Sequence, residues 1–285
     1  MEECDDVQEA TASTHGILEP ERGRAHFELR CLTPSEKLAD HVERHWIVSW
    51  DPLGDRGSFT QEILPHPCIN LVGEPGLIAV WGIPVARSPH RIKGTGVAIG
   101  TKFRPGGFAG FVGRPVSELN GRAISLATLF GPAGARLEHR LAAVAGNPER
   151  HIEAVEEFLA ARLPAPDARY RLVCAVVREM LIAAPGTTVA ELAERHAVSP
   201  RTLQRLFRDY VGVGPKWVLK RYRMHEAAER IAAGEADDHA ALAAELGYFD
   251  QPHFIRDFRS QIGQTPAAYA RACAAAAGRE PALAA

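Results

Sequence analysis

Two stretches in the last third of the chain decide its fold: Val198-Ser-Pro-Arg-Thr-Leu-Gln-Arg-Leu-Phe-Arg208 and Phe249-Asp-Gln-Pro-His-Phe-Ile-Arg-Asp-Phe-Arg259. The second repeats the first at an offset of 51 residues, so that Leu203 aligns with Phe254. The Leu-Ala pairs upstream of them, at positions 192 and 242, are offset by 50, so the second turn contains one inserted residue. A repeat that holds two short helices and a turn predicts two helix-turn-helix units.

Both stretches carry the signals of a capped helix. Ser199 and Asp250 are good N-caps, because their side-chain oxygens can accept hydrogen bonds from free backbone N–H groups. Pro200 suits the first helical position, where its missing N–H is no loss. Gly212 and Gly263 follow the last apolar residues and predict the helix ends. Apolar side chains recur at helical spacing, so each helix has one face to bury.

The opposite faces of the two predicted helices are polar and basic. Their outward residues are Arg201, Thr202, Gln204, Arg205 and Arg208 in the first helix and Gln251, His253, Arg256 and Arg259 in the second. An α-helix fits the major groove of DNA, where arginine pairs with guanine and glutamine with adenine. Arginines further along such a helix reach phosphates. Residues of this kind also cover the solvated face of ordinary amphipathic helices, but two copies with matched caps and arginines favour DNA recognition.

The segment from Ala190 to Tyr269 closely resembles the AraC/XylS family of bacterial transcription regulators. The resemblance covers about 85 residues, and its most specific part runs from Leu246-Gly-Tyr-Phe-Asp250 to Gly263-Gln-Thr-Pro-Ala-Ala-Tyr269. It implies two helix-turn-helix subdomains, bridged by a long helix, that enter successive major grooves. The first recognition helix would offer Arg201, Thr202, Gln204 and Arg205 to bases, and the second would offer Gln251, His253 and Arg256. Pro252 departs from the family pattern, which often has a small polar residue there. Double-stranded DNA is the implied partner, and RNA polymerase and a second copy of the chain are further candidates.

The bridge between the two units is also visible in the sequence. Residues 215–232 carry apolar side chains at broadly helical intervals and end before Gly234. A helix of about 17 residues is about 25 Å long, which suits two DNA-recognition helices placed about one DNA turn apart. The formal net charge of -2 gives no sign of DNA binding, but residues 201–230 hold eight Lys or Arg against three acids. This local basic stripe supports DNA binding.

The predicted fold class is α+β with two domains, which the length of 285 residues allows. The β-rich N-terminal domain has flanking helices, and the all-α C-terminal domain consists of two helix-turn-helix subdomains joined by a long helix. The predicted boundaries are a disordered lead-in at 1–22, a sensor or dimerisation domain at 23–163, a linker at 164–168, the DNA-binding domain at 169–271 and an Ala-rich tail at 272–285.

Local patterns predict the elements of the N-terminal domain. The candidate strands are His26–Leu32, His45–Trp50, Phe59–Leu64, Cys68–Gly73, Leu77–Trp81 and Val97–Phe103, separated by Gly, Pro and Asp. A helix is expected at Pro34–Val42. Short turns are expected at 115–119 and 126–130, and longer helices at 134–145, 149–163 and 170–183.

Two N-terminal stretches, Gln61–Val72 and Gly100–Gly107, resemble a sensor-like domain found in a subset of AraC-type regulators. A small-molecule effector is therefore a candidate partner. Its predicted pocket comprises Trp46, Trp50, Trp81 and His66, although tryptophans are more often core residues.

Other sites receive less support from the sequence. His66, Cys68 and His90 could approach one metal ion, but the spacing supplies no clear third ligand, so no metal or cofactor is predicted. Lys102 and Arg104 could help to bind an anion, although a plain turn is the simpler interpretation. The five cysteines are scattered, which predicts neither a disulfide framework nor a thiolate zinc site.

The predicted function is a sequence-specific transcription regulator modulated through its N-terminal domain. The chain has no apolar run that could cross a membrane and no signal-peptide pattern, so we expect a cytoplasmic protein without a membrane partner. It has no Gly-x-Ser-x-Gly, Walker or His-Glu-x-x-His motif, and no catalytic residue is predicted. The alternative function is a small-molecule-binding or enzymatic N-terminal domain with a helical protein-interaction module. A third hypothesis places a redox or metal signal at Cys68.

Overall fold

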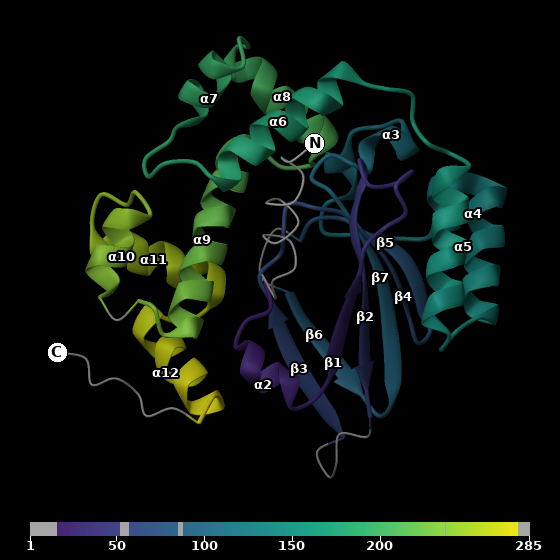
Figure 1. The fold of residues 1–285 in the computed structure, drawn as a ribbon, viewed down its shortest axis with the longest axis horizontal. Helices are drawn as coiled ribbons and strands as arrows, with labels where there is room; N and C mark the ends of the chain where they lie inside the picture. Colours follow the sequence, from purple (N-terminus) through teal and green to yellow (C-terminus); the bar gives the residue numbers. More distant parts are fainter. Residues whose placement is uncertain (1–15, 52–56, 85–87, 237, 279–285) are drawn as a thin grey trace.

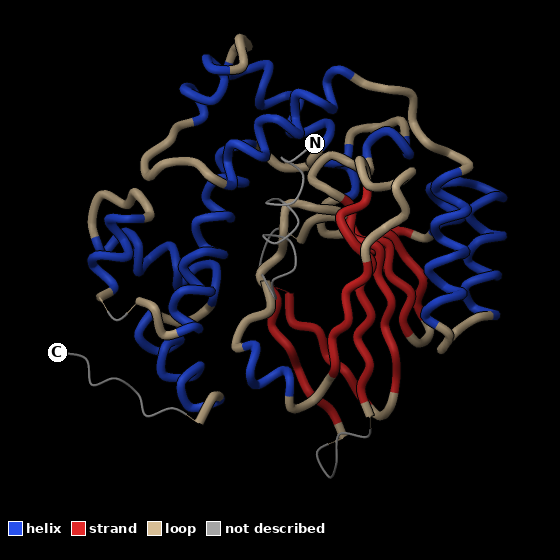
Figure 2. The backbone as a smooth tube through the Cα atoms, in the orientation of Figure 1, coloured by secondary structure: helices blue, strands red, loops and turns tan. Residues whose placement is uncertain are grey.

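The computed structural model describes residues 16–51, 57–84, 88–236 and 238–278. Its N-terminal half is rich in strands and its C-terminal half is helical (Figures 1 and 2). The helices α4 (Leu126–Ala143) and α5 (Pro148–Ala160) cover one side of the N-terminal sheet, and the C-terminal helices lie on the other side of this half (Figure 1). The predicted α+β class is confirmed.

The N-terminal half is built on a six-stranded antiparallel sheet and a two-stranded ribbon. The sheet has the order β1 (Glu28–Leu32), β2 (Val42–Trp50), β7 (Gly96–Phe103), β4 (Asn70–Glu74), β5 (Leu77–Trp81) and β8 (Ala123–Ile124). The ribbon pairs β3 (Ser58–Ile63) with β6 (Ser88–Lys93). All six predicted strands are present, with ends within three residues of the prediction. The sequence did not predict β6 or the two-residue β8. In β6, Pro89 and four polar or charged residues conceal the alternation.

The predicted helix at Pro34–Val42 is wrong. Residues 36–41 form turns, in which the Leu38 N–H donates to Ser35 O at 2.9 Å and the His41 N–H to Leu38 O at 2.8 Å. These turns place Leu38 in the core with no exposed surface. The chain then enters β2, whose pairing with β1 and β7 overrides the local helical pattern.

The predicted disordered lead-in at 1–22 is wrong for its last seven residues, while residues 1–15 lie outside the described part. Ile17 bridges Ile63 in antiparallel fashion, and Leu18 is 4% exposed. The helix α2 (Pro20–Arg24) follows directly. The apolar pair at 17 and 18 lets this segment extend the edge of β3 and become part of the fold.

Short helices connect the sheet to α4 and α5. They are α3 (Ala109–Val112) and the 3-10 helix η2 (Val116–Leu119). The sequence predicts a short turn at 126–130 and a separate helix at 134–145, and α4 contains both, joined by a kink. At the kink Gly131 has φ 59° and ψ -141°, and Pro132 follows it.

Two buried histidines lie at the contact between α5 and the sheet, His151 on α5 and His45 on β2. His45 on β2 lies between the Thr101 hydroxyl, 2.9 Å from Nδ1, and the Glu156 carboxylate, 3.0 Å from Nε2. His151 fits over Gly73 of β4, where an added Cβ would lie 2.3 Å from its Cε1 atom. Burial lowers the pKa of His151 to about 4. The close approach of the His151 ring therefore explains why β4 carries a glycine at position 73.

The C-terminal half contains seven helices within the described residues. They are α6 (Ala168–Leu181), α7 (Val189–Arg195), α8 (Pro200–Tyr210), α9 (Pro215–Ala233), α10 (His239–Glu245), α11 (Gln251–Ile262) and α12 (Pro266–Ala276). The predicted Ala-rich tail begins inside α12, and residues 279–285 lie outside the described part. None of the described helices is long and apolar enough to cross a lipid bilayer.

The hydrophobic core crosses the boundary between the two halves. One cluster joins Phe103 and Val116 to Val173 of α6 and Phe207 of α8. A second cluster contains Leu18 and Leu64 of the N-terminal half together with the helices of the second helix-turn-helix unit. The two halves are therefore packed against each other through apolar side chains.

Candidate DNA-binding surface

The first candidate reading helix, α8, is capped and oriented as the sequence predicts. The Ser199 hydroxyl accepts a hydrogen bond from the Thr202 N–H at 3.1 Å. Leu203, Leu206 and Phe207 are buried under the helix. Its opposite face exposes four of the five predicted residues, namely Arg201, Gln204, Arg205 and Arg208.

Thr202 has a different environment from the other four. It is half-buried, and its hydroxyl lies 2.9 Å from the Ser199 hydroxyl. The structure therefore gives Thr202 a place in the N-terminal cap, and its predicted base contact stays a prediction.

The second candidate reading helix, α11, follows the same design. The Asp250 carboxylate accepts from the His253 N–H at 2.6 Å, and Gly263 ends the helix in the left-handed conformation with φ 93°. Phe254, Phe258 and Ile262 are buried. All four predicted residues on the opposite face are exposed, namely Gln251, His253, Arg256 and Arg259.

Some arginines of the C-terminal half are held in ion pairs. Arg230 is paired with Glu245 at 2.6 Å, and Arg195 is paired with Glu179. By contrast, within the described ranges the five arginines of α8 and α11 form no ion pair (Arg201, Arg205, Arg208, Arg256 and Arg259). Their guanidinium groups are exposed, so phosphates or base edges can reach them without breaking an internal salt bridge.

α9 links the two units. Its 19 residues correspond to about 28 Å at 1.5 Å per residue. It begins at Pro215 and ends at Gly234, which adopts φ 80°, both as predicted. The Lys220 ammonium of α9 contacts the Asp257 carboxylate of α11 at 2.8 Å, and Arg223 donates to Thr187 O at 3.1 Å. Polar contacts thus hold each unit to the connecting helix.

Comparison with known families agrees with this geometry. Residues 192–272 match the model of a helix-turn-helix domain, and residues 30–125 match a domain of unknown function (DUF6597). The C-terminal region is a helix-turn-helix domain of the AraC type. The predicted resemblance is confirmed for this region, and the match at 30–125 shows that the β-rich half also has relatives.

The relatives of the AraC-type domain are transcription regulators. The chain is 37% identical over 86 residues to the HTH-type transcriptional regulator Rv1931c of Mycobacterium tuberculosis, covering 30% of this chain and 33% of that protein. It is 38% identical over 82 residues to a putative AraC-like transcription regulator of Streptomyces antibioticus, covering 29% and 27%. The matches thus span only about a third or less of the relatives' length.

Among solved structures, ToxT of Vibrio cholerae aligns with 87% of this chain and 98% of its own, at 12% identity and a TM-score of 0.36.

The residues of the predicted effector pocket have several separate partners. Trp46 and Trp50 belong to one hydrophobic cluster with Phe59, and their rings lie over Gly100 and Gly96. Trp46 and Trp81 flank Asn70 on one face of the sheet, and the Trp46 Nε1–H donates to Asn70 Oδ1 at 3.2 Å. The tryptophans Trp46 and Trp50 thus contribute to the core.

His66 has a different neighbour. Its ring stacks on that of His225 in α9, with centroids 4.1 Å apart. The structure places it at the contact between the two halves, so the use of these four residues by an effector stays a prediction.

The other sites considered from the sequence are engaged in internal contacts. His90 pairs with Glu74 at 3.3 Å, and this hydrogen bond raises the pKa of His90. Burial raises the pKa of Cys68 to about 11, which suppresses the reactive thiolate. Lys102 pairs with Glu43 at 2.7 Å, and Arg104 donates to Ala39 O at 2.7 Å.

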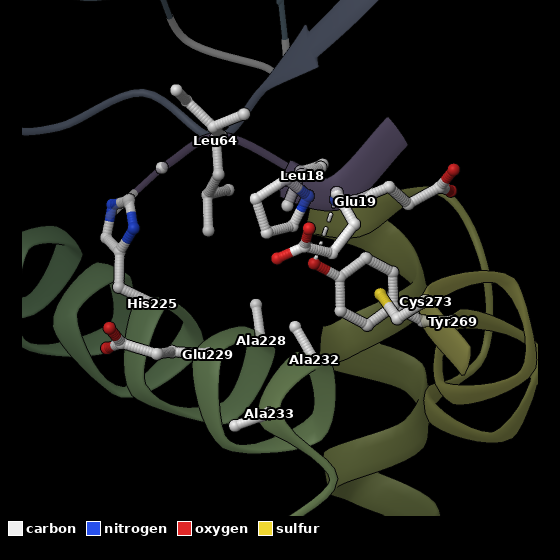
Figure 3. A pocket seen from close by; sticks show the side chains of 14 residues that line it. Leu18, Glu19, Leu64, His225, Ala228, Glu229, Ala232, Ala233, Tyr269 and Cys273 are labelled. Carbon is white, nitrogen blue, oxygen red and sulfur yellow. Dashed lines mark hydrogen bonds between the residues drawn. The ribbon is translucent and has the colours of Figure 1, made fainter. Parts of the chain in front are cut away.

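A cavity of about 180 Å³ lies where the N-terminal segment meets α9 and α12 (Figure 3). Leu18 and Leu64 face Ala228 and Ala232 across it, with Tyr269 at one end (Figure 3). The Glu19 N–H donates to the Tyr269 hydroxyl at 3.2 Å, and the Gln264 amide donates to the Glu19 carboxylate at 2.9 Å. Sequence reasoning missed this contact, because its partners are about 250 residues apart.

Proposed function

We propose that this chain is a bacterial transcription regulator that binds specific sequences of double-stranded DNA through α8 and α11. The observation that carries the proposal is the pair of capped helices, each with exposed arginines that have no ion-pair partner within the described ranges. A major groove admits one such helix, and α9 supplies a spacing near one helical turn of DNA. This role implies a cytoplasmic location.

The positions along each helix assign different roles to the exposed side chains. Arg201, Gln204 and Arg205 lie in the first turns of α8, where side chains reach base edges. Gln251, His253 and Arg256 occupy the corresponding turns of α11. Arg208 and Arg259 lie further along and suit phosphates, which position the protein without reading sequence.

Selection of bound duplexes from a randomised library, with the full-length protein at physiological salt, tests the proposal. We expect two short motifs about one helical turn apart. The Arg205→Ala variant should then bind the selected duplex about 5- to 150-fold more weakly, equivalent to about 1–3 kcal/mol, and should tolerate other bases at one position.

A matched control is available in the N-terminal half. Arg136 on α4 is also exposed and has no ion pair in the described part of the chain. The Arg136→Ala variant should bind as the wild type does. If no motif is recovered and random duplex DNA is not bound even at low salt, the proposal fails and the protein-interaction alternative is favoured.

Modulation through the N-terminal half is the second element of the proposal. Asn120, next to η2, donates to Gly212 O at 2.7 Å, directly after α8. Glu19 contacts Tyr269 and Gln264 around α12. Each helix-turn-helix unit is therefore in contact with the N-terminal half near one end, and a small-molecule effector, a second copy of the chain or RNA polymerase could act through these contacts.

The Asn120→Ala variant tests this coupling. If docking of the N-terminal half restricts the first unit, loss of this hydrogen bond should change the affinity for the selected duplex by about 3- to 10-fold. Unchanged affinity together with an unchanged response to added ligands would contradict a role of this contact in modulation.

A further inference from the structure

The second reading helix begins with an apolar surface that packing does not explain. Phe249 is 95% exposed and directly precedes Asp250, the N-cap of α11. Pro252, in the first turn of the helix, is also exposed. We call Phe249 and Pro252 the apolar tip. Phe249 is absent from the hydrophobic cluster of this unit, whose aromatic residues include the buried Phe254 and Phe258.

The internal repeat shows how unusual this tip is. At the offset of 51 residues, Phe249 corresponds to Val198 and Pro252 to Arg201. Val198 is half-buried and packs against the core of the first unit, whereas Arg201 is exposed. The first helix therefore presents a guanidinium group at the position where the second presents apolar carbon.

DNA offers one apolar group that such a tip can recognise. In the major groove, the C5-methyl group of thymine is the apolar feature that distinguishes base pairs, and side chains near the N-terminus of a reading helix approach it. We infer that the apolar tip contacts thymine methyl groups, so that the site read by α11 contains thymine at a fixed position. This inference rests on the proposed function, because it requires α11 to enter the major groove.

The surroundings of the tip favour DNA over an apolar protein partner. Gln251, between the two tip residues, is exposed and can pair with adenine, the complement of thymine. Arg256 and Arg259 follow on the same helix without ion pairs in the described part of the chain. An apolar contact beside exposed arginines fits DNA, where a thymine methyl group lies close to negatively charged phosphates. The centre of a protein–protein interface, by contrast, is usually depleted of charged residues.

Replacement of thymine by deoxyuridine tests the inference, since it removes only the methyl group. Each thymine of the α11 motif in the selected duplex is replaced in turn, and Kd is measured by fluorescence anisotropy with the full-length protein. Wild-type protein should lose about fourfold in affinity at one or two positions, the fold-change expected for one buried carbon.

The Phe249→Ser variant should bind the thymine duplex about as weakly as wild type binds the deoxyuridine duplex, and it should no longer distinguish them. Because Phe249 is exposed, this variant should fold normally. Ile182 is 86% exposed and lies outside the reading helices, so Ile182→Ser is the matched control and should keep the full thymine preference.

The outcomes separate the inference from the function on which it rests. If the protein selects no DNA motif, the proposed function fails. If it selects motifs but tolerates deoxyuridine at every position, the apolar tip does not read methyl groups, while DNA binding stands. A Phe249→Ser variant that keeps the thymine preference also overturns the inference and directs attention to a protein partner.

Discussion

Arg221 of α9 is a buried cation without a carboxylate partner within the described residues. It is 3% exposed, and its Nε and Nη1 atoms have no hydrogen-bond partner there. Its guanidinium carbon lies 4.4 Å from the centre of the Trp217 ring. Burial lowers the pKa of Arg221 to about 10, well below the usual value of a guanidinium group.

This pKa shift determines the sign and size of a mutational effect. A lowered pKa means that folding disfavours the charged form, and at pH 7 Arg221 is charged in both the folded and the unfolded protein. At 1.36 kcal/mol per pKa unit, the shift corresponds to a destabilisation of about 3 kcal/mol. The contact with Trp217 offsets about 1 kcal/mol in the folded state, and it would be lost on substitution. Arg221→Met, which fills much of the same volume, should therefore raise the free energy of unfolding by about 2 kcal/mol.

Urea denaturation at pH 7, followed by far-UV circular dichroism, measures this change. Arg223→Met on the same helix is the matched control, because Arg223 is half-buried and its guanidinium donates to Thr187 O at 3.1 Å. The control should lower the free energy of unfolding by about 1 kcal/mol. If Arg221→Met destabilises the protein as much as the control does, the guanidinium is satisfied in solution and the reasoning is refuted.

Stability should also fall as the pH drops from about 6.5 to 4, because the folded protein keeps His151 neutral, with a pKa of about 4, while the unfolded chain binds a proton. The free energy of unfolding, obtained from urea titrations across this range, should fall by about 3 kcal/mol. The His151→Gln variant should lose most of this pH dependence. Gly73→Ala should cost about 1–3 kcal/mol, since its Cβ would lie 2.3 Å from the His151 ring. Thermal unfolding of the double variant with His151→Ala should recover part of that loss; no recovery would contradict the clash. Arg208→Ala and Arg259→Ala should each reduce the slope of log Kd against log salt by about 0.9, if each arginine neutralises one phosphate. An unchanged slope would remove that arginine from the phosphate contacts.

Sequence reasoning succeeded where structure depends on neighbours along the chain. The caps at Ser199 and Asp250, the helix end at Gly263 and the extent of α9 all lie where local signals predict them. It failed where distant pairing decides. The segment at 34–42 has a helical pattern but forms turns, because the adjoining β2 pairs with β1 and β7.

The same distinction applies to the candidate sites. The exposure of the arginines on α8 and α11 follows from the spacing of their buried apolar neighbours, which the sequence contains. The exposure of Phe249 does not follow, because an aromatic residue beside a helical stripe is usually expected to be buried. The sequence also does not show that the Thr202 hydroxyl lies beside the Ser199 hydroxyl in the N-terminal cap of α8, which only the structure reveals.

The sequence by itself determined that the last third of this chain consists of two similar helical units, each with a buried stripe and a basic outer face. Helix periodicity and capping act over three or four residues, so they can be read from a single chain. Only the tertiary structure decided that the N-terminal segment extends β3, that Leu18 and Leu64 complete the core of the second unit, and that Glu19 meets Tyr269. Those contacts join residues up to 250 positions apart. They depend on how apolar surfaces fit together after the helices and strands have formed.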